Sequence, residues 1–237
     1  MTDLERATRE SRIAGMRDDG AEIVEFPGAY EDAVRAASAT AREVGGIFFS
    51  DTDPSGSDPI PHWIMAGYTH LFDEYSTQWR EPPDIVLVQA GVGGLACATG
   101  SWFRHRFDGG GPYTIACEPD SAACLLESAT SPGGEPVTVV RGTRTFMAGL
   151  RCATPSRAAW VGIKETFDAF ITVPDSLAVD AMERLRQEDP PVDAGPSGAC
   201  GVASLIALCN AGELESVRSA SGLDRSSRIF VIVTEGP

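Results

Sequence analysis

The sequence predicts an α/β fold in which helices cover both faces of a mostly parallel, twisted sheet. Short apolar runs of strand length alternate with segments whose apolar residues recur at helical spacing, and turns rich in Gly, Pro, Asp and Ser separate them. In addition, the apolar run 85–88 leads through a glycine turn directly into a helical pattern. That succession is typical of a doubly wound sheet.

The first predicted unit lies within the first 50 residues. Residues 21–26 form a short apolar run, and residues 30–44 carry apolar residues at helical spacing. Gly45 and Gly46 then end the helix before a second apolar run at 47–49. This order predicts a strand, a helix and a strand.

The rest of the chain continues the alternation. A helix at 61–78, a buried strand at 85–88, a helix that ends near residue 106 and a strand at 114–117 form a second unit. The later predicted elements share the same apolar periodicity between polar turns: helices near 122–128, after Pro155, at 176–188 and at 198–211, and strands at 137–140, 169–173 and 229–234. Stretches 109–112, 131–136 and 189–196 are predicted loops.

Composition excludes several classes of function. The 237 residues carry 34 acidic and 19 basic side chains, a net charge of −15, so nucleic acid is not an expected partner. No apolar run is long enough to cross a bilayer and the first 17 residues contain no export signal, which predicts a cytoplasmic protein. The six cysteines show no metal-binding spacing, so we expect no metal and mostly buried free thiols.

The most informative local feature is DIVLVQAGVGGLACATG, in which a strand runs into glycines and then into a helix. Glycines let the backbone approach a phosphate, and a helix N-terminus offers free N–H groups and a favourable dipole. A plain tight turn is the simpler interpretation. A third interpretation is a dinucleotide site, because Gly91, Gly93 and Ala96 fit G-x-G-x-x-A and Glu118 ends the following strand.

Several dispersed stretches together resemble the diaminopropionate ammonia-lyase family. They are SDTDPSGSDPIPHWIMAGYTHLFDE, VLVQAGVGGLACA, ACEPDSAACLLESA, TFMAGLRCATPSRAAW, SGACGVASL and VIVTEG. This family belongs to the fold type II pyridoxal-phosphate enzymes, the tryptophan synthase β-like group. The resemblance runs from about residue 10 to the last residues, and it implies pyridoxal phosphate as the cofactor.

The resemblance implies a role for each matching position. The phosphate cradle would be Gln89, Ala90, Gly91, Val92, Gly93 and Gly94, and Thr234 and Glu235 would contact the cofactor ring. Asp51 matches a catalytic acid that exchanges the Cα proton of the substrate or assists loss of its β-amino group. The implied reaction is α,β-elimination, which releases ammonia from 2,3-diaminopropionate or a similar amino acid.

The sequence also departs from the family pattern. Fold type II enzymes bind the cofactor aldehyde on a lysine near the start of the chain, followed by an asparagine-containing loop, and neither is present here. The single lysine, Lys164, falls within the helix after TPSRAAW. Pro196 replaces a glutamate before SGA, and Pro54 and Ser57 stand where the family tends to have aromatic residues near the catalytic acid.

These departures imply an incomplete large domain. Residues 1–50 would correspond to the end of the small domain or its junction, and 51–237 to a cofactor-phosphate-binding large domain truncated at its N-terminal side. Such a sheet exposes an edge and an apolar face, so we expect a homo-oligomer or a partner subunit that bears the lysine. Cys124 and Cys152 lie in segments that the family brings to the active-site side, where they would form a redox-sensitive pair or remain separate thiols.

Three functions therefore stay open. The chain is a lyase completed by another polypeptide, or a lysine-free descendant that binds a phosphate-bearing ligand with different or no catalysis, or an NAD-type nucleotide-binding domain. The first two keep the glycine turn as a phosphate site. The third instead requires Glu118 to reach a ribose.

Overall fold

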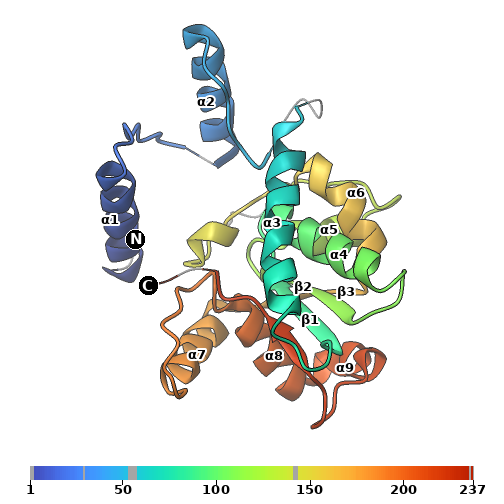
Figure 1. Ribbon diagram of the computed structural model, residues 1–237. Coiled ribbons are helices and arrows are strands. Elements are labelled where there is room, and N and C mark those ends of the chain that lie inside the picture. Colours follow the sequence, from blue (N-terminus) through green and yellow to red (C-terminus); the bar gives the residue numbers. More distant parts are fainter. Residues whose placement is uncertain (1–2, 29, 53–57, 141–143, 235, 237) are drawn as a thin grey trace. The chain divides into compact units, whose positions relative to one another are not determined.

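A computed structural model describes residues 3–28, 30–52, 58–140, 144–234 and 236, with side chains described from residue 9 onward (Figure 1). The chain forms two compact units. The first ends at Phe48, and the second extends from Phe49 to Gly236.

The first unit contains two helices, α1 (Asp3–Asp18) and α2 (Tyr30–Val44). Acidic residues in the first turn of α2 and Arg42 in its last turn complement the helix dipole. The predicted strands at 21–26 and 47–49 are wrong, because both segments are extended without a ladder in the part that the structure describes. Their side chains explain this: Val24 is 82% exposed and Ile47 81%, so neither apolar run has a face to pack against.

The second unit is built on a sheet of four parallel strands: β1 (Ile85–Gln89), β2 (Tyr113–Pro119), β3 (Ala169–Val173) and β4 (Ile229–Val231). Their order is β3-β2-β1-β4. Gln89 is in register with Cys117, and Leu87 with Val231, so the carboxyl ends of the strands lie at one edge. The predicted parallel sheet is confirmed.

Two predicted strands differ from the structure. The last strand stops at Val231, three residues before its predicted end, and the segment 137–140 is not a strand. Val139 is buried in an apolar cluster, and its N–H donates to the Ala153 carbonyl at 2.8 Å. Val140 is 96% exposed, so this run of apolar residues is covered at one position and pairs with no strand among the described residues.

Helices cover both faces of the sheet, as predicted (Figure 1). Val86 and Val88 of β1 belong to one apolar cluster and Ile85 and Leu87 to the other, which reflects the alternation of side chains along a strand. On the first face lie α3 (Ile60–Ser76), α4 (Gly94–Arg106), α5 (Cys124–Thr130) and α6 (Arg157–Thr166). On the second lie α7 (Asp175–Arg186), α8 (Cys200–Asn210) and α9 (Glu215–Ser221).

An aromatic cluster fixes α3 against α4. The ring of Phe72 lies 5.9 Å from that of Phe103 and 5.8 Å from that of Trp102, and Trp79 stacks on Phe103 at 5.8 Å. Trp102 also donates a hydrogen bond from Nε1 to Asp73 at 2.8 Å. These contacts hold the C-terminal half of α3 beside the C-terminal half of α4.

Among the described residues, no single helix has the length and apolar character needed to cross a membrane. Helix α8 and the segment Gly212–Ser221 have that length and apolar character only when they are taken together, and the chain bends by 91° between them.

Candidate functional site

The glycine turn lies where the sequence places it, between the carboxyl end of β1 and the first turn of α4. The Ala90 N–H continues the sheet ladder by donating to the Cys117 carbonyl at 2.9 Å. The first intrahelical bond of α4 is from the Cys97 N–H to the Gly93 carbonyl, at 2.8 Å. The N–H groups of the first helical turn have no intrahelical acceptor, and no acidic residue occupies that turn. The geometry is therefore that of an anion site.

Gly93 is required by both conformation and space. Its φ is 102°, in the left-handed region that favours glycine, and a Cβ built on it would lie 2.4 Å from Ile163 Cδ1. Ile163 is fully buried in α6. The turn therefore cannot carry a side chain at residue 93.

Two cysteines flank Gly91. A Cβ built on Gly91 would lie 3.1 Å from Cys152 Sγ and 3.0 Å from the Gly149 carbonyl oxygen, and Cys124 Sγ donates to the Gly91 carbonyl at 3.4 Å. Both cysteines are buried free thiols, as are Cys97, Cys117 and Cys200, whereas Cys209 is exposed. The structure thus brings Cys124 and Cys152 to the same glycine without a disulfide.

Gly94 faces the other predicted functional residue. A Cβ built on Gly94 would lie 3.8 Å from the Tyr68 ring, 4.0 Å from Asp51 Cβ and 4.0 Å from Met65 Cγ, which are ordinary contact distances. Asp51 is half-buried at this position. Burial, and secondly the charge of Asp51, raise the pKa of the Tyr68 hydroxyl. Gly94, in the first turn of α4, therefore lies close to the side chain of Asp51.

Gln89 and Thr234 are joined directly. Gln89 Nε2 donates to Thr234 Oγ1 at 2.8 Å, although the two residues are 145 positions apart. Gln89 therefore points to the end of the last strand and not to the glycine turn. The Ala90 N–H is likewise engaged, since it donates to the Cys117 carbonyl of the sheet. The resemblance implies that both residues hold phosphate, and in the structure these two groups make other hydrogen bonds. Glu235, Pro54 and Ser57 lie outside the described residues.

Glu118 has a role that the sequence reasoning missed. Its side chain is fully buried, and its two carboxyl oxygens accept the Leu125 N–H at 2.7 Å and the Leu126 N–H at 2.8 Å. Burial raises the pKa of this carboxyl to about 8, against the opposing effect of these two hydrogen bonds. Glu118 caps α5 from within the protein, so it is not exposed to a ribose. The sequence feature that indicates this capping role is the spacing of six residues between Glu118 and Cys124, where α5 begins.

Lys164 is exposed on α6. Its neighbour Ile163 is buried beneath Gly93, so the lysine leaves the helix on the solvent side. Lys164 is therefore a solvated residue of a helix, and this helix is the one that the sequence predicts after TPSRAAW. Among the described residues, no group of three or more His, Cys, Asp or Glu side chains is arranged to hold a metal ion.

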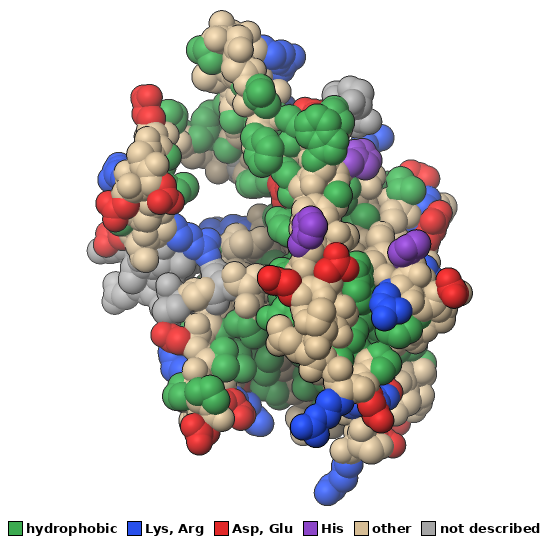
Figure 2. Space-filling view, in the orientation of Figure 1, with side chains coloured by type: hydrophobic (Ala, Val, Ile, Leu, Met, Phe, Trp, Pro, Cys, Tyr) green, Lys and Arg blue, Asp and Glu red, His purple; other side chains and the backbone are tan. Residues whose placement is uncertain are grey.

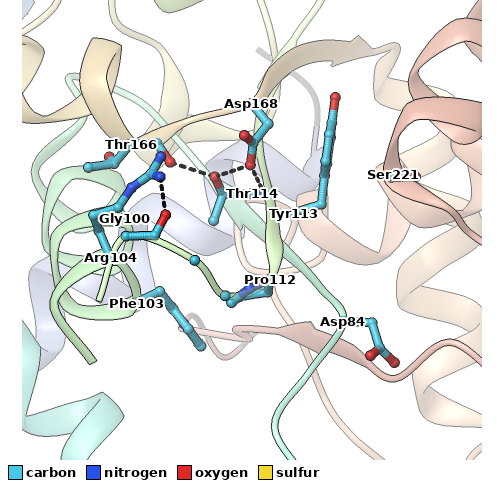
Figure 3. Close-up of a pocket in the computed structure, with 13 residues that line it drawn as sticks. Asp84, Gly100, Phe103, Arg104, Pro112, Tyr113, Thr114, Thr166, Asp168 and Ser221 are labelled. Atoms are coloured by element: carbon cyan, nitrogen blue, oxygen red, sulfur yellow. Dashed lines mark hydrogen bonds between the residues drawn. The ribbon is translucent and has the colours of Figure 1, made fainter. Parts of the chain in front are cut away.

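A hollow of about 330 Å³ lies at the opposite end of the sheet (Figure 3). Asp84 precedes β1 and Tyr113 begins β2, so this hollow is at the amino ends of the strands. Its polar groups bind one another: Asp168 Oδ2 accepts the Thr114 N–H at 2.7 Å, and Arg104 Nη1 donates to the Gly109 carbonyl at 2.7 Å. Because ligands of open α/β sheets bind outside the carboxyl ends of the strands, we place the site at the glycine turn.

Comparison with protein families shows the family of the chain. The family described as "Pyridoxal-phosphate dependent enzyme" matches residues 4–234. The chain belongs to this family. Pyridoxal phosphate carries a phosphate group, and the residues present fit such a group at the glycine turn, where Gly94 leaves the backbone of the first turn of α4 without a side chain.

Within the pyridoxal-phosphate family, the chain is similar to diaminopropionate ammonia-lyases, which confirms the resemblance seen in the sequence. It is 34% identical to that of Salmonella typhimurium over 233 residues, 95% of this chain and 58% of that protein. The E. coli protein is 32% identical over 98% of this chain and 60% of its own length. The chain thus spans less than two thirds of these relatives.

Solved structures agree on the fold. Diaminopropionate ammonia-lyase of E. coli, in a crystal structure in complex with D-serine, matches with a TM-score of 0.85 and 32% identity over 95% of this chain and 57% of that chain. Maize serine racemase matches with a TM-score of 0.75 and 23% identity over 95% of this chain and 63% of its own. The second relation shows the fold alone, which is that of the tryptophan synthase β-like enzymes.

Proposed function

We propose that this chain holds the phosphate of pyridoxal phosphate on the glycine turn and takes part in α,β-elimination, which releases ammonia from 2,3-diaminopropionate or a similar amino acid. The observation that carries the proposal is the nearness of Asp51 to Gly94, where a built Cβ would lie 4.0 Å from Asp51 Cβ. It supports a site in which a helix N-terminus binds an anion and a carboxylate lies close by.

Each residue has a separate task in this proposal. The first turn of α4 binds the phosphate through its N–H groups, since glycines leave the backbone accessible there. When bound, pyridoxal phosphate supplies the electron sink for proton loss from the substrate Cα. The Asp51 carboxylate lies across from Gly94, where it would attract the second ammonium group of the substrate and hold a proton during its departure.

A lysine from another part of the assembly completes the site in this proposal. Arginine stays protonated and cannot replace a lysine amine, and Lys164 is directed to solvent. Exposed apolar side chains on α3 offer a surface for such an assembly, since Trp63 is 66% exposed and Tyr75 40%. Figure 2 shows an apolar group at one end of this helix, with His and acidic side chains farther along it. We therefore propose a cytoplasmic homo-oligomer or a complex with a lysine-bearing subunit, in which residues 51–237 act as the phosphate-binding domain and residues 1–50 as the junction.

The second candidate is a lysine-free protein that uses the same cradle for another phosphate-bearing ligand. The solvent-directed Lys164 favours it, since binding of a phosphate needs no amine. The dinucleotide interpretation has less support, because buried Glu118 is engaged with two N–H groups of α5.

Titration with pyridoxal phosphate tests these functions. We expect saturable binding that inorganic phosphate competes away, with no borohydride-fixed adduct when this chain is alone. A stable adduct on Lys164 would contradict the need for an external lysine. If NAD(H) stabilised the chain and pyridoxal phosphate did not, the proposed function would be overturned.

The role of Asp51 is tested in the complete assembly with 2,3-diaminopropionate. We expect Asp51→Asn to reduce kcat by about 10²-fold or more while cofactor binding is kept, because a general acid or base contributes about that much. Asp58→Asn is the matched control, since Asp58 lies near the start of α3 and accepts the Ile60 N–H at 2.9 Å. Equal activity of Asp51→Asn and the parent protein would remove Asp51 from the mechanism.

A further inference from the structure

Helix α3 places a tyrosine on the face that packs against the rest of the second unit. Met65, Tyr68 and Phe72 are spaced by three and four residues, so their side chains share one face of the helix. Met65 and Phe72 are buried, whereas Tyr68 between them is 36% exposed. Tyr68 therefore lies where the buried face of α3 meets space that solvent can enter.

A buried serine attaches Asp51 to the glycine turn. The Ser156 N–H donates to the Val92 carbonyl at 2.8 Å, and Ser156 Oγ donates to the Asp51 carbonyl at 3.5 Å. The backbone of Asp51 is thus linked through one residue to the turn that leads into α4. This link fixes the side chain of Asp51 beside the first turn of that helix.

The side chains of Tyr68 and Asp51 approach the same point of the turn. A Cβ built on Gly94 would lie 3.8 Å from Tyr68 Cε2 and 4.0 Å from Asp51 Cβ. Cε2 is bonded to the ring carbon that bears the hydroxyl, so the polar end of the tyrosine ring is the end near Gly94. Burial, and secondly the charge of Asp51, raise the pKa of this hydroxyl, so it keeps its proton near neutral pH.

These two side chains differ in what they offer to a ligand. The Asp51 carboxylate only accepts hydrogen bonds, whereas a phenol has one proton to donate and lone pairs that accept. The negative charge of Asp51 favours the orientation in which the Tyr68 proton points toward the carboxylate. The lone pairs of the phenol oxygen then point away from Asp51, so a ligand beside Gly94 meets two acceptors, one of which is charged.

Two acceptors at one point match an ammonium group better than a hydroxyl group. An ammonium has three N–H donors and a positive charge, so it can donate to the carboxylate and to the phenol oxygen together. A hydroxyl has one proton and can donate to only one of them. The acceptor that is left without a donor makes the hydroxyl the poorer ligand.

We propose that Tyr68 is a specificity-determining residue: together with the Asp51 carboxylate, its hydroxyl accepts a hydrogen bond from the β-ammonium group of the substrate. This inference rests on the proposed function and deepens it, because it names the feature by which the substrate is selected. The site takes 2,3-diamino acids and disfavours 2-amino-3-hydroxy acids. Tyr68 acts by contact with the substrate, which separates its role from that of the N–H groups that bind phosphate.

Binding of two stable conjugates tests this inference on the chain itself. N-phosphopyridoxyl-2,3-diaminopropionate and N-phosphopyridoxyl-serine, each linked through the α-nitrogen, carry the phosphate and the ring but no aldehyde, so neither needs a lysine. They differ at the β-position, where the first has an amino group and the second a hydroxyl. By calorimetry at neutral pH, we expect the parent chain to bind the diamino conjugate about 30-fold more tightly than the serine conjugate.

Tyr68→Phe keeps the ring and removes the oxygen that accepts. We expect the preference for the diamino conjugate to fall about tenfold, because one hydrogen bond to a charged group is lost, while affinity for the serine conjugate changes by less than about twofold. Loss of folded protein would weaken both conjugates alike, so the ratio of the two affinities reports only the β-position. Tyr75→Phe is the matched control, since Tyr75 lies on the same helix and its ring packs against Phe230 at 5.5 Å. Its preference should equal that of the parent chain.

The outcomes separate the two proposals. If the parent chain bound neither conjugate, or if inorganic phosphate did not compete with them, the proposed function would be overturned. Equal binding of both conjugates by the parent chain would overturn the selection of an ammonium group and leave the phosphate site in place. A preference that Tyr68→Phe retains in full would assign the selection to Asp51 alone and remove Tyr68 from it.

Discussion

Two glycine clusters in this chain look alike in sequence and differ in structure. In the cluster 91–94, Gly93 faces Ile163 Cδ1 at 2.4 Å and Gly91 faces Cys152 Sγ at 3.1 Å, measured from built Cβ atoms. In the cluster 109–111, Gly109 has no atom within 4 Å, and a Cβ built on Gly111 meets only Phe107, four residues earlier, at 3.2 Å. Both clusters contain left-handed residues. The difference is that distant segments of the chain pack behind the first cluster, whereas the second contacts only its own neighbourhood in the sequence.

The largest expected effect is at Gly93. We expect Gly93→Ala to lower the free energy of unfolding by about 3 kcal/mol or more, from left-handed strain and overlap with Ile163. Gly109→Ala is the matched control, because it adds left-handed strain, about 1–2 kcal/mol, without a clash. Urea denaturation of both variants measures the difference. Equal losses would show that the packing behind Gly93 is not restrictive.

The next effect concerns Glu118 and pH. Its pKa is about 8 in the folded protein and near 4.5 when unfolded, so the folded state binds this proton more tightly. The resulting stability is complete below pH 4.5 and is lost as pH rises through 8. The loss is on the order of 4 kcal/mol.

Denaturation of Glu118→Gln across this pH range checks the prediction. Glutamine cannot ionise, so this variant should lack that part of the pH dependence, although it weakens one cap of α5 at every pH. Glu127→Gln, at an exposed position on the same helix, removes only the smallest of the causes that raise the pKa of Glu118, so it should stay close to the parent curve. Parallel curves for the parent protein and Glu118→Gln would exclude Glu118 as the titrating group.

A smaller effect is expected at the amino end of the sheet. Asp168→Ala removes the acceptor of the Thr114 N–H and should cost about 1–2 kcal/mol, since Thr114 is buried. Binding of pyridoxal phosphate should not change, because Asp168 lies at the end of the strands opposite the glycine turn. If Asp168→Ala also lost affinity for pyridoxal phosphate, the ligand site would have to depend on both ends of the strands.

The smallest effect on stability is expected at Gly94. Gly94→Ala meets neighbouring atoms only at 3.8–4.0 Å, so the free energy of unfolding should change by less than about 1 kcal/mol. The added methyl fills the cradle, and affinity for pyridoxal phosphate should fall about tenfold. Calorimetry on the folded variant measures both quantities. Unchanged affinity would show that the phosphate does not bind at the first turn of α4.

The sequence predicted the second unit better than the first, for a physical reason. Strands β1 and β3 lie within the predicted segments or one residue beyond them, because buried parallel strands are apolar runs bounded by turns. The runs at 21–26 and 47–49 have the same local pattern, but a strand also needs a neighbour. Propensity cannot supply that information.

The site shows the same limit. The glycine turn could be predicted, since three glycines after an apolar strand are a local signal. The contact of Gln89 with Thr234 could not, because it depends on β1 and β4 being neighbours in the sheet. Asp51 lies beside Gly94 only in the folded chain, and the pattern of a polar residue after a short apolar run does not reveal this contact.

The contacts behind the glycine turn link ligand binding to the folding of the whole second unit. The atoms that fix Gly91 and Gly93 come from residues 124, 149, 152 and 163, up to 70 positions farther along the chain. Such non-local contacts form late in folding. The turn is thus a cooperative product of the sheet and its helices, and a nascent chain that ends before α6 would present the same glycines without a phosphate-binding conformation. Binding of the cofactor can therefore be used to measure when the second unit has finished folding.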